Sequence, residues 1–95
     1  IKVMGTIVNG KREGVWTSFH PNGNLQSENN YKNGILDGKC IAKTPNGQMI
    51  YIGYYFNGKY DGQWLYFNKE GEIEKEIYFD KGKIIKTVEG EDLPQ

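Results

Sequence analysis

The sequence predicts an all-β protein built as an antiparallel meander of β-hairpins with about eight strands. Asn-Gly pairs recur at Asn9, Asn33 and Asn57, a period of 24 residues without insertion or deletion. Apolar and aromatic runs flank these pairs, which is the strongest short-range signal of a hairpin. Glycine is also too frequent for a helical period to persist. A fixed period of this size indicates a repeat array, in which each unit buries its apolar side only against its neighbours.

Three glycines recur in every unit and are expected to form turns. One follows Asn, one follows Glu or Asp, and one stands at the fifteenth position of the unit. Glycine, and Asn or Asp beside it, tolerates the positive φ angles that tight turns require. The expected turn-forming glycines are Gly10, Gly14, Gly23, Gly34, Gly38, Gly47, Gly58, Gly62 and Gly71.

Each unit is expected to hold an opening strand and a closing strand. In the third unit the opening strand places Trp64 and Tyr66 on one face and Leu65 and Phe67 on the other, because side chains alternate along a strand. The closing strand covers residues 72–79, and the loop Asn-Gly-x-x-Asp-Gly then reverses the chain. Both faces of a single-layer sheet cannot be core, so one face is a candidate groove.

The closing strands of the first and third units alternate between an apolar inner face and a polar outer face. This alternation is typical of a strand with one buried face and one solvated face. The inner set is Leu25, Tyr31, Ile73, Ile77 and Phe79, and the outer set is Gln26, Glu28, Asn30, Glu72, Glu74 and Glu76. Glu72, Glu74 and Glu76 are spaced too widely for one metal ion, and a solvated face is expected there.

The closing strand of the middle unit departs from this rule. Its outer positions carry Ile50, Ile52, Tyr54 and Phe56 in place of polar residues. Either the strand is covered on both sides, by the chain itself or by a symmetry mate, or the patch binds a partner, since large exposed apolar patches mark interaction sites. A homodimer formed through this strand would satisfy both interpretations.

The repeat register defines one expected repeat domain at residues 1–88. It contains units 9–32, 33–56 and 57–80, with half-units at 1–8 and 81–88, followed by a polar tail at 89–95. The sequence does not begin with Met, so we expect a processed or truncated product whose parent carries further repeats. No segment resembles a transmembrane helix or a signal peptide, and the compartment is not predicted.

Composition and residue inventory argue against an enzyme. Twelve basic and twelve acidic residues leave no net charge, and Arg12 is the only arginine, which does not favour nucleic-acid binding. Cys40 stands where the other units have Trp and is expected to be a small core residue. His20, the only histidine, is expected to be exposed on a turn. We therefore predict no catalytic residue, no metal site and no cofactor.

The run from Gly10 to Leu25 reads Gly-x-x-Glu-Gly-x-Trp-x-x-Phe-x-x-Asn-Gly-x-Leu, and the run from Gly58 to Ile73 is comparable. This pattern resembles the MORN repeat (membrane occupation and recognition nexus), and is closest to its second variant, common in bacteria and present in antitoxin-like proteins. The middle copy departs from it, with Cys40 for Trp and Lys43 for the aromatic residue. The resemblance implies an elongated, twisted sheet of stacked hairpins. It also implies roles in protein scaffolding, dimerisation and phospholipid contact.

The predicted function is a non-catalytic scaffold for protein–protein interaction, including homodimerisation or antitoxin-like binding of a partner. One alternative is a cell-surface array that binds choline or carbohydrate through its aromatic residues, and another is a phospholipid-contacting module. Exposed Tyr and Trp are favoured contact residues. The candidate interaction surface is Trp16, Phe19, Ile50, Ile52, Tyr54, Phe56, Trp64, Tyr66 and Phe67.

Overall fold

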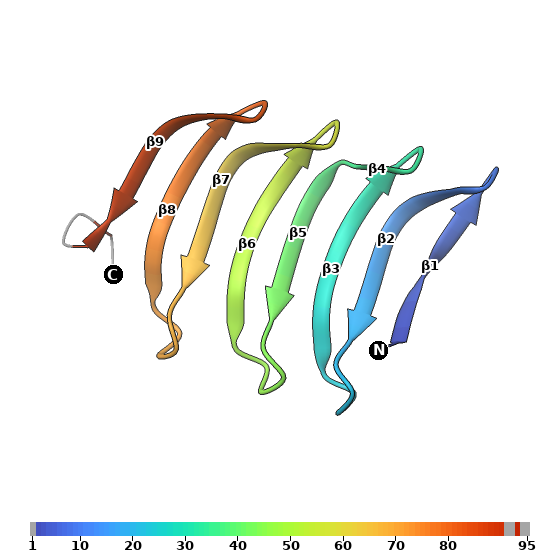
Figure 1. Ribbon diagram of the computed structural model, residues 1–95, viewed down its shortest axis with the longest axis horizontal. Helices are drawn as coiled ribbons and strands as arrows, with labels where there is room; N and C mark the ends of the chain where they lie inside the picture. The colour runs from blue at the N-terminus through green and yellow to red at the C-terminus, as the bar shows by residue number, and fades with distance from the viewer. Residues whose placement is uncertain (1, 91–92, 94–95) are drawn as a thin grey trace.

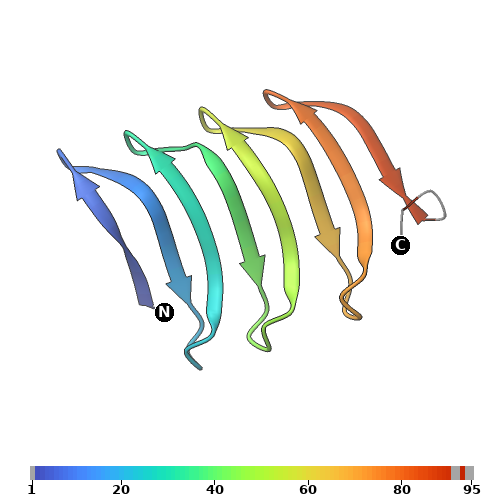
Figure 2. The same ribbon diagram turned by 180° about the vertical axis from the view of Figure 1, so that it is seen from behind.

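The computed structural model describes residues 2–90 and residue 93, and its strands form one open antiparallel sheet (Figure 1). The sheet measures 47 × 33 × 13 Å, so it is a single layer without a covering element (Figure 2). The strands are β1 (Lys2–Val8), β2 (Lys11–Phe19), β3 (Leu25–Lys32), β4 (Ile35–Leu36), β5 (Gly38–Lys43), β6 (Met49–Phe56), β7 (Lys59–Phe67), β8 (Ile73–Asp80) and β9 (Lys83–Glu89). The predicted all-β meander is confirmed.

The described residues hold nine strands rather than about eight, because the opening strand of the middle unit is interrupted. β4 ends at Leu36 and β5 begins at Gly38, with Asp37 between them. The sheet order is β1-β2-β3-β5-β6-β7-β8-β9, with β4 paired to β3. Glu89 belongs to β9, whereas residues 1, 91–92 and 94–95 of the predicted first half-unit and tail lie outside the described residues.

The Asn-Gly pairs form two-residue hairpin turns. Asn57 has a φ of 49° and Gly58 a φ of 83°, and the flanking residues Phe56 and Lys59 pair directly. Two successive positive φ angles define the turn whose twist matches that of the strands on either side. Lys81 takes the Asn position of the fourth turn with a φ of 47°. The reversal is therefore two residues long, and not the six-residue loop expected from the sequence.

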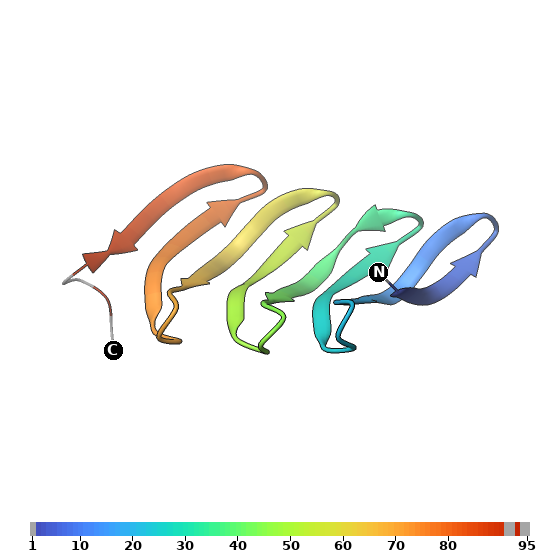
Figure 3. The ribbon, with the colours of Figure 1, turned by 60° about the horizontal axis from the view of Figure 1, so that its bottom comes forward.

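The glycines after Glu or Asp lie within or at the start of strands, where the strand pairing is irregular. In β7, residues 62–64 lie opposite the single residue Gly53 of β6, because Ile52 pairs with Leu65 and Tyr54 with Asp61. Gly62 accommodates the bulge with a φ of 67°. Such bulges bend a strand and increase its twist. The bend recurs near the turn end of each opening strand and gives the sheet its curved profile (Figure 3).

Backbone hydrogen bonds join the second, third and fourth two-residue turns to the unit before each of them. The amide of Gly34 donates to Arg12 O at 2.9 Å, that of Gly58 to Leu36 O at 2.7 Å, and that of Gly82 to Tyr60 O at 2.6 Å. The donor and acceptor positions are the same in all three units. This ladder keeps the units in register along the side of the sheet where the two-residue turns lie.

On the opposite side of the sheet, side chains of one loop form hydrogen bonds to the loop of the next unit. Asn22 Nδ2 and Asn24 Nδ2 donate to Pro45 O at 2.9 and 2.7 Å. His20 Nε2 lies 2.8 Å from Lys43 O, which can only accept, so this nitrogen carries the hydrogen. His20 is half-buried and bonded, contrary to the expectation of an exposed turn residue.

Candidate interaction surface

One face of the sheet carries an aromatic cluster centred on Trp64. The described buried core consists of Cys40, Trp64 and Phe79, with Tyr51, Tyr55, Tyr66 and Ile77 packed against it. The ring centroid of Tyr60 lies 4.5 Å from that of Trp64, and Tyr55 meets Trp64 edge-on at 5.2 Å. Aromatic rings at these spacings attract one another beyond the area they bury. We call this side of the sheet the inner face.

The inner face continues into the first unit with weaker packing. Trp16 meets Tyr31 edge-on at 6.4 Å, and the Arg12 guanidinium lies 4.2 Å from the centroid of the Trp16 ring. Trp16 is half-buried, whereas Trp64 is 2% exposed. The side chains of the third unit therefore supply most of the core.

The opposite, outer face is apolar along β6. Ile50 is 41% exposed, Tyr54 45% and Phe56 47%, while Ile52 is half-buried between its cross-strand neighbours Ile41 and Leu65. β6 has strands on both sides, so this exposure does not arise from a free sheet edge. We call Ile50, Ile52, Tyr54 and Phe56 the β6 patch.

The prediction of a solvated outer face on β8 is wrong at Glu76, which is only 5% exposed. Glu76 Oε1 accepts a hydrogen bond of 2.7 Å from the Tyr78 hydroxyl, and Gln63 Nε2 approaches the same oxygen at 3.4 Å. Its cross-strand neighbours are Leu65 and Val88. Glu76 is therefore surrounded by residues of β7, β8 and β9, a result of register that the alternation along one strand does not reveal.

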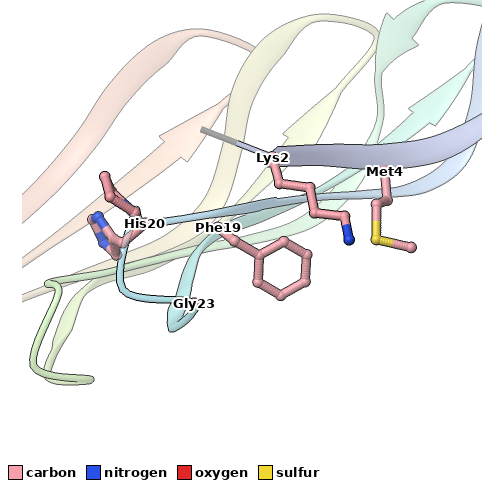
Figure 4. Close-up of a pocket in the computed structure, with 6 residues that line it drawn as sticks. Lys2, Met4, Phe19, His20 and Gly23 are labelled. Atoms are coloured by element: carbon pink, nitrogen blue, oxygen red, sulfur yellow. The ribbon is translucent and has the colours of Figure 1, made fainter.

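The remaining sequence-predicted residues separate between the two faces. Tyr66 lies on the inner face, its ring stacked 6.3 Å from that of Trp64. Phe19 lies at the other end of the sheet and lines a hollow of about 680 Å³ with Lys2 and Met4. The three side chains extend to the same side of the sheet (Figure 4). The structure therefore does not bring the predicted surface residues together as one site.

Two further hollows lie beside the β6 patch. One, of about 110 Å³, includes Ile50 and Phe67. The other, of about 270 Å³, lies near the two-residue turns and includes Ile35, Asp37 and Phe56. Ile35 is 45% exposed and extends the apolar surface next to Phe56, a neighbour that sequence alternation within one strand does not identify.

The ionisable groups of the core are held in their neutral forms. Burial raises the pKa of the Cys40 thiol from 9.0 to about 11, and burial also raises the pKa values of Tyr51 and Tyr55. A reactive cysteine needs a lowered pKa and access to solvent. Cys40 has neither, being 1% exposed, and it fills the core position predicted from the sequence. No group of three metal-ligating side chains occurs among the described residues.

These features define a class of protein: an open array of β-hairpins whose neighbouring units are joined by hydrogen bonds at their turns. More specifically, the chain belongs to the MORN repeat variant family, whose model matches residues 12–33, 36–57 and 60–81. The family is a non-catalytic repeat module, and MORN repeats are generally thought to mediate protein or membrane-lipid interactions. A search of the curated proteins finds no match for the chain. No helix in the described part of the chain is long and apolar enough to cross a membrane.

Proposed function

We propose that this protein is a non-catalytic scaffold that binds another protein through the β6 patch. The observation that carries the proposal is the exposure of Ile50, Tyr54 and Phe56, each above 40%, on an interior strand of the sheet. Large exposed apolar patches are uncommon on isolated proteins and mark surfaces that a partner covers. Trp64 is not part of the proposed surface, because it is only 2% exposed and lies in the core.

The packing behind the patch suits a binding surface. Tyr51 and Tyr55 alternate with the patch residues along β6 and pack on the inner face against the Trp64 cluster. The strand is therefore held in place before a partner arrives. A surface that is ordered in advance loses less conformational entropy on association, which raises affinity.

A second copy of the chain is one partner that this patch could accept. Two β6 patches facing each other would cover apolar side chains on both copies, and stacked sheets pack about 10 Å apart. The patch could also cover a different protein, as in the antitoxin-like role that the sequence resemblance suggests. Both forms require the same face, so one experiment on that face tests both.

Site-specific photo-crosslinking tests the proposal directly. The photoreactive amino acid p-benzoylphenylalanine would replace Tyr54 in one variant and the exposed edge residue Ile84 in a matched control. We expect a protein adduct from position 54 in the cells that express the protein, and a homodimeric adduct from purified protein if the partner is a second copy. Adducts only from position 84, or from neither position, would contradict the proposal. Liposomes added to the purified protein would reveal lipid adducts, which would contradict a protein partner if they formed alone.

A charge introduced into the β6 patch provides a second measurement. Tyr54→Lys places an ammonium in the patch, and Ile84→Lys makes a similar change outside it. We expect Tyr54→Lys to abolish the adduct formed from a photoreactive residue at position 50, because a lysine there must be desolvated on binding. Ile84→Lys should leave the adduct intact.

A further inference from the structure

The acidic residue at the fifth position of each unit has a different environment in the middle unit. In the first unit Glu13 Oε1 accepts a hydrogen bond of 3.0 Å from the amide of Asn33. In the third unit Asp61 Oδ1 accepts one of 2.9 Å from the amide of Lys81. Both bonds tie the carboxylate to the next two-residue turn. In the middle unit, among the described residues, Asp37 makes no such bond to Asn57.

The interruption between β4 and β5 explains the difference. The amide of Asp37 donates to Asn30 O at 2.9 Å, and Asn30 Nδ2 donates to Lys39 O at 2.9 Å. These bonds replace the continuous strand that carries Glu13 and Asp61 in the other units. Gly38 accordingly has a φ of 108°, compared with 67° at Gly62. The Asp37 carboxylate is thereby left half-buried without a hydrogen-bond or ion-pair partner in the described structure.

Asp37 lines the 270 Å³ hollow that is also lined by Ile35 and Phe56. The volume lies just below the range of roughly 300–1,000 Å³ that is typical of pockets for drug-sized ligands, so the hollow suits a small group such as one side chain. Ile35 and Phe56 supply an apolar wall, being 45% and 47% exposed. The Phe56 ring already attracts a cation, because the Lys81 ammonium lies 5.4 Å from its centroid.

We propose that this hollow accepts an arginine side chain of a partner protein. The methylene stem would lie along Ile35, the guanidinium plane would stack on Phe56, and its N–H groups would donate to the Asp37 carboxylate. Arginine suits such a site because its planar fork binds carboxylates in a bidentate manner and stacks on aromatic rings. Lys32 also lines the hollow and the Lys81 ammonium lies over the Phe56 ring, so both of these exposed lysine side chains would have to move aside for the arginine.

The inference deepens the proposed function, since it rests on the β6 patch as a protein-binding surface and names a residue that the partner presents. Phe56 belongs to both the patch and the hollow. A partner that covers Tyr54 would therefore bring its adjoining residues to Asp37.

A peptide titration followed by NMR tests the arginine assignment. The probe is the tripeptide Ac-Ala-Arg-Ala-NH2, and its control carries citrulline, which keeps the shape of arginine but has no charge. We expect the arginine peptide to shift the resonances of Ile35 and Asn57 at millimolar concentration. The citrulline peptide should bind roughly tenfold more weakly, because a hydrogen bond to a charged group is lost.

Two variants make the test specific to Asp37. Asp37→Asn should weaken the arginine peptide by a similar factor, to roughly the level of the citrulline peptide. Asp61→Asn, the matched change in the third unit, should leave the titration unchanged. Equal binding of both peptides, no binding of either, or full binding to Asp37→Asn would overturn the arginine assignment. The crosslinking from position 54 does not depend on this titration, so failure of one is distinguishable from failure of the other.

Discussion

The indole of Trp64 rests against the backbone of Gly53, at the place where a β-carbon would otherwise stand. Trp64 Nε1 also donates a hydrogen bond of 2.9 Å to the carbonyl oxygen of Tyr54. The same arrangement occurs two repeat units earlier. There the Trp16 ring covers Gly5, and Trp16 Nε1 donates to Thr6 O at 3.1 Å. Neither glycine is among those with positive φ, so close approach of the ring is the reason for glycine here.

Gly53→Ala is therefore expected to destabilise the protein. The added methyl group would overlap the indole ring and force Trp64 out of the aromatic cluster. Overpacking of this kind costs about 1–3 kcal/mol. Urea unfolding followed by tryptophan fluorescence measures the loss, and a free energy of unfolding equal to that of the wild type would contradict the proposed contact.

The middle unit supplies a matched control for this pair, because it has Asn29 and Cys40 where the others have Gly and Trp. Gly53→Asn should cost less in a Trp64→Cys background than in the wild type, since cysteine leaves room for the asparagine side chain. The two changes together should show a coupling of about 0.5–3 kcal/mol in a double-mutant cycle. Additive changes would mean that the ring does not limit the residue at position 53.

The hydrogen bonds between acidic side chains and the next turn predict different effects for equivalent acidic residues. Asp61→Ala removes the acceptor for the Lys81 amide and should cost about 0.5–1.5 kcal/mol, whereas Asp37→Ala removes no such bond and should leave stability within about 0.5 kcal/mol. Amide hydrogen exchange provides the measurement. Exchange at Lys81 should accelerate in Asp61→Ala, and exchange at Asn57 should not change in Asp37→Ala. Equal losses of stability would contradict the difference between the units.

The raised pKa of Cys40 predicts a loss of stability in alkaline solution. The unfolded thiol loses its proton near pH 9.0, whereas the folded thiol keeps it up to about pH 11. The contribution is thus complete below the unfolded pKa and declines as the pH rises between these values, by roughly 2–3 kcal/mol. Tyr51 and Tyr55 act in the same direction above their ordinary pKa of 10.0.

Urea unfolding at a series of pH values checks this prediction, with Cys40→Ala as the control. The wild type should lose stability from about pH 9 upward, and the variant should lose less because only the tyrosines remain. Parallel curves for the two proteins would show that the thiol is not held in its neutral form by burial.

Much of the fold was predictable because it depends on local chemistry. The Asn-Gly pairs mark the positions of the turns through their tolerance of positive φ, although the sequence predicted a longer loop there, and the period of 24 residues places those turns in register. Alternation along β6 assigned Tyr54 and Phe56 to the outer face, where both are exposed. Each of these inferences needs only residues within one hairpin.

The candidate site was predictable only in part, because its other members come from neighbouring strands. The sequence identified the middle unit as irregular and singled out the apolar outer positions of β6. It did not show that Ile35 lies beside Phe56, or that Asp37 interrupts its strand and leaves its carboxylate unpaired. The second fact depends on Asn30, on another strand, which accepts a hydrogen bond from the Asp37 amide and donates one to Lys39 O.

The sequence by itself therefore determined the repeat period, the turns and the choice of inner and outer faces, since these follow from backbone preferences and two-residue alternation. The tertiary structure alone decided which side chains of each face are covered. Glu76 is buried beneath Tyr78 and Gln63, and the Trp64 ring occupies the space beside Gly53 that a side chain would need. Nothing adjacent in the sequence requires the burial of Glu76 or the absence of a side chain at position 53. Burial depends on cross-strand register and bulges, which are set when the strands pair.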